Sequence, residues 1–73
     1  MGIQHSERSW RASTLVDEYC ALKGEHDCLE STITDLITDV LILAHMEGID
    51  INSICRMAEV HVSAETAAYR EVA

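Results

Sequence analysis

The sequence contains no proline and no phenylalanine, and its 73 residues include only one tryptophan and two tyrosines. Hydrophobic residues still make up 48% of the chain, so a core must be built from Ile, Leu, Val, Ala and Met. Such a set is typical of helical proteins. A chain this short buries only about 60% of the surface that its unfolded form exposes. We therefore expect one all-α domain over residues 1–73, with residues 1–8 flexible and with a tendency to self-associate.

Basic residues are also scarce, because five Lys and Arg face thirteen Asp and Glu, for a net charge of −8. Residues 1–24 carry three acids and three bases, so the whole net charge lies in residues 25–73, where ten acids face Arg56 and Arg70. Such a surface repels phosphate backbones and anionic membranes and attracts basic partners. We predict no direct binding to nucleic acid or membrane, and a protein partner with a basic surface.

Long apolar runs and paired cysteines are missing as well. The longest apolar run, residues 40–44, is far shorter than the roughly 20 residues of a membrane span. The first ten residues, MGIQHSERSW, contain no apolar segment typical of a signal peptide. The three cysteines, Cys20, Cys28 and Cys55, are an odd number without a paired spacing, which argues against a disulfide framework. These features predict a cytoplasmic protein, in the host cytosol if a phage encodes it.

Apolar periodicity and capping residues predict three helices, at about residues 9–22, 28–47 and 51–71. Ser6 or Ser9 is a candidate cap for the first helix, and Gly24 follows its end. Asp27 is a candidate cap for the second helix, with Glu30 three residues later in a capping-box pattern.

The second helix carries a wide apolar stripe, which covers roughly 160° of its circumference. The predicted core and dimer residues on it are Leu29, Ile33, Leu36, Ile37, Val40, Leu41 and Leu43. The many β-branched residues make a strand the competing interpretation, but spacing of three and four residues over about twenty positions favours a helix. Because one neighbour cannot cover so wide a stripe, we predict a homodimer in which the hairpins formed by the second and third helices pair into a four-helix core.

A short corner, GID, joins the second and third helices. Gly48 is expected to end one helix, Asp50 to cap the next, and Ile49 to pack onto Ile54. So short a connection is typical of a long antiparallel helical hairpin.

Four side chains are weak candidates for a metal site. Asp35 and Asp39 lie one helical turn apart and could hold Mg²⁺, although a solvated acidic face is the commoner explanation. His61 and Glu65 share a face of the third helix and could act as acid and base or bind a metal. A pair whose members simply satisfy each other is again commoner. We therefore predict no catalytic site and no resident metal.

The segments ITDLITDV, GID and AEVHVSAE resemble short phage and prophage helical proteins with a TDLLTDL…GID…AxxHxxxE pattern, a group without an established role. Residues 35–65 also resemble, more distantly, the central helices of MazG-type all-α nucleotide pyrophosphohydrolases. That family binds Mg²⁺ through carboxylate clusters on two successive helices. The resemblance implies an all-α fold with Asp35 as a retained carboxylate, whereas Thr32 stands where a glutamate is expected.

Two functions follow as expectations. The first is a small, non-enzymatic interaction protein of phage or prophage origin that binds and modulates or inhibits a host protein, as anti-CRISPR and other anti-defence proteins do. Its predicted contact residues are Trp10, Asp35, Asp39, Ile42, Met46 and Glu47. Trp10 lies off the apolar stripe of its helix and is either a lid over the core or an exposed anchor. The alternative is a reduced MazG-like, Mg²⁺-dependent nucleotide binder or pyrophosphohydrolase.

Overall fold

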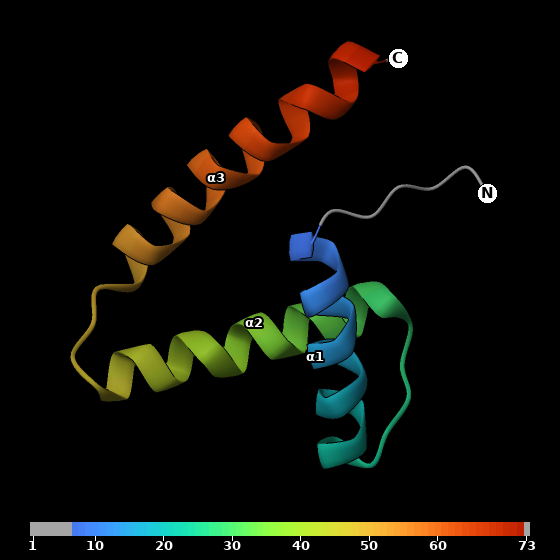
Figure 1. The fold of residues 1–73 in the computed structure, drawn as a ribbon. Helices are drawn as coiled ribbons and strands as arrows, with labels where there is room; N and C mark the ends of the chain where they lie inside the picture. Colours follow the sequence, from blue (N-terminus) through green and yellow to red (C-terminus); the bar gives the residue numbers. More distant parts are fainter. Residues whose placement is uncertain (1–6, 73) are drawn as a thin grey trace. The chain divides into compact units, whose positions relative to one another are not determined.

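The computed structural model describes the backbone of residues 7–72 and the side chains of residues 7–67. This part of the chain forms three helices and no strand (Figure 1), namely α1 (Glu7–Lys23), α2 (Leu29–Met46) and α3 (Ile51–Val72). The predicted all-α fold class is confirmed. Within residues 7–72, no helix is long and apolar enough to cross a membrane. The candidate cap Ser6 and residues 1–6 of the segment expected to be flexible lie outside the described residues. Helix α1 already includes residues 7 and 8, so the prediction that Ser9 caps it is wrong.

The chain divides into two compact units, with the boundary inside α2. Unit 1 extends from Met1 to Val40 and contains α1 and the first part of α2. Unit 2 extends from Leu41 to Ala73 and contains the last turns of α2, the corner and α3. The single domain expected over residues 1–73 stays a prediction.

Helix α1 ends at a glycine in the left-handed conformation. Gly24 has φ of +74°, and its N–H donates to the Cys20 carbonyl at 2.9 Å. This single bond from the residue after the cap back to the last turn is the αL termination motif, which favours glycine because it has no Cβ. The predicted stop at Gly24 is therefore present in the structure.

Helix α2 begins one residue later than its predicted start. The Cys28 carbonyl accepts the first helical hydrogen bond, from the Thr32 N–H at 3.0 Å, and the helix itself starts at Leu29. The N-cap position is consequently occupied by Cys28, and the prediction that Asp27 fills it is wrong. The N-cap is the residue whose carbonyl accepts the first helical hydrogen bond. A residue one position earlier is not the N-cap, even when its side chain is a good capping group.

The threonines of the helices bond to their own backbone. The hydroxyls of Thr34 and Thr38 donate to the carbonyls one turn earlier, at 2.9 and 2.8 Å, and Thr14 and Thr66 do the same in α1 and α3. Each hydroxyl thus has an acceptor without leaving the helix. This local bonding lets α2 contain threonines that would suit a strand equally well.

Hydrogen bonds fix the corner between α2 and α3 at both ends. Gly48, with φ of +78°, donates its N–H to the His45 carbonyl at 3.1 Å, and the Ile49 N–H donates to Ala44 at 2.9 Å. This pair of bonds is the Schellman motif. On the other side, the Asp50 carboxylate accepts the Asn52 N–H at 3.0 Å and caps α3. The predicted helix stop at Gly48 and the cap at Asp50 are both present.

Few side chains are buried. Among the residues whose side chains the structure describes, only Ala44 and Thr32 are buried, and none of α1 is. On the predicted stripe of α2, Leu36 and Leu41 are half-buried, and the remaining members are exposed: Leu29, Ile33, Ile37, Val40 and Leu43. Near the corner, α3 is half-buried only in its first turn, and every residue from 55 to 65 is exposed. The long antiparallel hairpin and the dimer core stay predictions.

Candidate functional site

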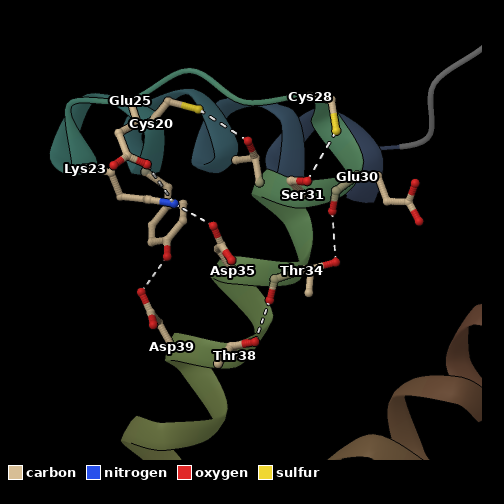
Figure 2. A network of polar contacts seen from close by, with 12 residues as sticks. Cys20, Lys23, Glu25, Cys28, Glu30, Ser31, Thr34, Asp35, Thr38 and Asp39 are labelled. Carbon is tan, nitrogen blue, oxygen red and sulfur yellow. Dashed lines mark hydrogen bonds and ion pairs between the residues drawn. The ribbon is translucent and has the colours of Figure 1, made fainter.

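Two pairs of polar side chains join α1 to α2 within unit 1. The Lys23 ammonium lies 2.6 Å from an Asp35 carboxylate oxygen, and the Tyr19 hydroxyl donates to the Asp39 carboxylate at 2.5 Å. The Lys23 nitrogen also lies 5.4 Å from the centre of the Tyr19 ring, which is within cation–π range. Figure 2 shows the side chains of Asp35 and Asp39 directed from α2 toward α1. We call these four residues the α1–α2 clamp.

The clamp changes the acidity of its members on α1. The hydrogen bond to Asp39 is the main reason that the pKa of Tyr19 rises to about 12, because a phenolate would lose that bond and would face a carboxylate. The hydrogen bond to Asp35 raises the pKa of Lys23, because it favours the ammonium form. Lys23 also lies 3.7 Å from Glu25, a weaker contact at the surface. Both pKa shifts thus arise mainly from contacts between α1 and α2.

These contacts bear on the predicted roles of Asp35 and Asp39. Both carboxylates have a partner on α1, and either metal binding or contact with a second protein would have to compete with that partner. Asp35 is half-buried and Asp39 is exposed. The structure thus gives the two residues a first role in holding the helices of unit 1 together.

The other metal candidates lie on α3. His61 and Glu65 are both exposed there, in unit 2, whereas Asp35 and Asp39 belong to unit 1. Over the described residues, no group of three or more His, Cys, Asp or Glu side chains is placed to hold a metal ion. The two candidate pairs are therefore separate pairs, and neither is completed by a third ligand from that part of the chain.

Cys28 has an environment that sequence reasoning missed. Its sulfur lies 3.3 Å from the Ser31 hydroxyl oxygen (Figure 2). Its pKa is lowered, first because that hydroxyl can donate to the thiolate and then because the Ser31 and Glu30 N–H groups at the start of α2 do the same. Free N–H groups in the first turn of a helix stabilise a thiolate. The available signal was a cysteine three residues before a serine at the start of an apolar periodic segment.

An apolar groove runs between α1 and the first turns of α2. It has a volume of about 570 Å³ and lies wholly in unit 1. Its lining comprises Ser9, Trp10, Ala12, Ser13, Val16, Asp17, Leu29, Ile33, Leu36 and Ile37. Trp10 is 68% exposed at this groove, which favours the anchor over the lid among its two predicted roles. We call this feature the α1–α2 groove.

The remaining predicted contact residues lie in unit 2. Ile42 and Met46 are one helical turn apart near the end of α2, with exposed fractions of 55% and 74%, and Glu47 follows them and is also exposed. We call these three residues the α2 terminal patch. It combines two exposed apolar side chains with an exposed carboxylate.

The fold and these features define a small all-α protein with exposed apolar surfaces. No family model, no curated protein and no solved structure matches the chain.

Proposed function

We propose that the protein is a non-enzymatic interaction protein that binds a host protein and modulates or inhibits it. The observation that carries the proposal is the α2 terminal patch, where two large apolar side chains remain exposed beside a carboxylate. Exposed apolar surface of this kind is typical of sites where proteins associate. Its position beside a hydrogen-bonded corner supports a preorganised contact surface, which costs little conformational entropy on binding.

The charge of the chain supports a basic partner. Apart from Arg56 and Arg70, the part of the chain from Leu41 onward has only acidic charges, five in number, and the chain as a whole carries −8. A field of one sign accelerates encounter with a surface of the opposite sign and disfavours partners of like charge. Binding that uses this field should weaken as salt increases.

The clamp refines the set of proposed contact residues. Asp35 and Asp39 already bind Lys23 and Tyr19, so their contribution to a partner is to maintain unit 1 and to add to the negative field. Of the other predicted contact residues, Trp10 lines the α1–α2 groove, and Ile42, Met46 and Glu47 in the α2 terminal patch are the ones proposed to touch the partner directly. The likeness to short phage and prophage proteins supports a bacterial partner and a place of action in the host cytosol.

The test begins with capture of a partner from bacterial lysate on the tagged protein, and continues with the purified partner in titration calorimetry. We expect Ile42→Asp and Met46→Asp to weaken the affinity at least tenfold, and the affinity of the original chain to fall with added salt. Leu22→Asp is the matched control, because Leu22 is an exposed apolar residue of unit 1 that lies outside the patch. Equal affinity for all three variants would refute the assignment of the patch.

The alternative of a MazG-like nucleotide binder or pyrophosphohydrolase makes a different prediction. It needs Asp35 and Asp39 to exchange their contacts with Lys23 and Tyr19 for Mg²⁺. No contact in the described part of the chain favours that exchange, so the interaction protein is the function that we propose.

A further inference from the structure

Among the described residues of unit 1, only α1 and α2 line the α1–α2 groove. Over the described residues of unit 1, Thr32 is the only buried side chain, and its hydroxyl accepts from the Cys20 thiol at 4.0 Å. Leu29 and Ile37, on the α2 wall of the groove, are each more than half exposed. Two helices in contact along one seam cannot cover a stripe as wide as that of α2.

The groove is held open by the protein itself. The clamp contacts run from Tyr19 to Asp39 and from Lys23 to Asp35, so they fix the last turn of α1 against the second half of the α2 segment in unit 1. The α1 side of the groove is nearer the start of that helix, at residues 9–17. A surface that is preformed in this way loses little entropy when another molecule occupies it.

The chemistry of the lining argues against the basic partner proposed for the α2 terminal patch. Of the ten lining side chains, Asp17 alone is charged. A basic protein would gain little from this groove. A second copy of the chain, by contrast, can approach here without placing its many acids against one another, since depletion of charge is the mark of an interface centre.

The shape of the α2 wall also fits a second copy. Leu29, Ile33 and Ile37 lie four residues apart on one face, and each both lines the groove and remains exposed. In a two-fold interface the same patch of each copy contacts its equivalent on the other copy, so the patch must be complementary to itself. A ridge that borders its own groove satisfies this condition, because each copy can insert its ridge into the other's groove.

We propose that the α1–α2 groove is closed by the same groove of a second copy, in a two-fold dimer whose core is the four helices α1, α2 and their partner equivalents. Its centre is the ridge Leu29, Ile33 and Ile37. The dimer uses residues of unit 1, whereas the α2 terminal patch belongs to unit 2, so the proposal goes beyond the proposed function and is tested by different variants. A standard interface has about 20–30 residues a side. Ten lining residues a side place this dimer at the small end, and its formation should depend on protein concentration.

The first test is sedimentation velocity over a wide concentration range. We expect the full chain to move from monomer toward dimer as concentration rises, and Ile37→Asp to shift this transition to at least tenfold higher concentration. Ile42→Asp is the matched control, since Ile42 is the same residue type in the same helix with nearly the same exposure, 55% against 52%. We expect the control to dimerise like the original chain.

A second variant and a cross-link keep the proposal testable if Ile37→Asp fails to fold by circular dichroism. In a chain whose three cysteines are changed to serine, Ile33→Cys should form an intermolecular disulfide on mild oxidation, because Ile33 is the middle of the ridge. Ile42→Cys should not. A monomer at every concentration, or a dimer that Val62→Asp on α3 dissociates while Ile33→Cys fails to cross-link, would overturn the proposal.

Discussion

Lys23 and Asp35 are twelve positions apart in the sequence, yet the ammonium of one lies 2.6 Å from the carboxylate of the other. Tyr19, one turn before Lys23, reaches Asp39, one turn after Asp35. The two pairs thus join residues one turn apart on α1 to residues one turn apart on α2, in opposite order along the two helices. The carboxylate pair that suggests a metal site from its spacing is therefore also the partner of a tyrosine–lysine pair with the same spacing.

The hydrogen bond from Tyr19 to Asp39 predicts an unusual tyrosine titration. In a Tyr69→Phe background, the ultraviolet absorbance of Tyr19 should titrate near pH 12, since its pKa is raised to about 12. The Asp39→Asn variant should titrate closer to the ordinary value near 10, because it removes the carboxylate. A raised folded-state pKa stabilises the fold below pH 10, and this contribution is lost as the pH rises through about 12. An unshifted Tyr19 in the original chain would contradict the clamp.

Cys28 is expected to react faster than an ordinary thiol at neutral pH. In a background with Cys20 and Cys55 changed to serine, the rate of alkylation by iodoacetamide should reach half of its plateau at a lower pH in the folded chain than in the same chain unfolded in urea, because the fold lowers the pKa of Cys28. Ser31→Ala should move the midpoint upward, since Ser31 supplies the largest share of the shift. A depressed folded-state pKa stabilises the fold above the unfolded value, and that contribution is lost as the pH falls through the folded value. Identical midpoints for the two proteins would remove Ser31 from the explanation.

The left-handed conformation of Gly48 predicts that substitutions there lower the free energy of unfolding to different extents. A Cβ at this position meets no atom within 4 Å, so the cost of Gly48→Ala comes from the positive φ of +78° alone. We expect a loss of about 1 kcal/mol in the free energy of unfolding. Gly48→Asn should cost less, because asparagine adopts the left-handed conformation more readily than alanine. Urea unfolding measures both, and an alanine variant as stable as the original would show that the Schellman turn contributes little.

Mg²⁺ and nucleotides distinguish the two functions raised by the sequence. For an interaction protein, we expect the melting temperature to stay the same when nucleoside triphosphates and Mg²⁺ are added. A bound ligand at a hundred times its dissociation constant would stabilise the fold by about 2.7 kcal/mol, which a thermal-shift assay detects easily. A rise that disappears in Asp35→Ala would favour the MazG-like alternative.

Local signals in the sequence predicted the helices well. The helices occupy Glu7–Lys23, Leu29–Met46 and Ile51–Val72, where about 9–22, 28–47 and 51–71 were expected. Gly24 and Gly48 end helices because their positive φ requires glycine, and Asp50 caps α3 because its carboxylate bonds the next turn. Such features depend on residues within four or five positions of each other, which a sequence displays directly.

The contacts of the candidate site depend on residues farther apart and were not predictable. The position of Asp39 in the second helix predicts a solvated face. The spacing of residues in the sequence does not identify Tyr19, twenty positions away, as its partner. For the apolar stripe of α2, the sequence predicted the arrangement of the residues but not their neighbours. Periodicity predicts correctly which residues share a face, but it does not say what covers that face, and Leu29 and Ile37 are exposed in the isolated chain.

The threonines that bond to their own helices alter how the surface of α2 meets other molecules. The hydroxyl groups of Thr34 and Thr38 donate hydrogen bonds to carbonyls one turn earlier, so neither threonine has a free hydroxyl hydrogen to donate to another molecule. The side of the helix that carries these threonines is therefore less polar toward an approaching molecule than its residue types suggest. A description of α2 as a helix with one apolar and one polar side therefore understates how much of its surface can make apolar contacts.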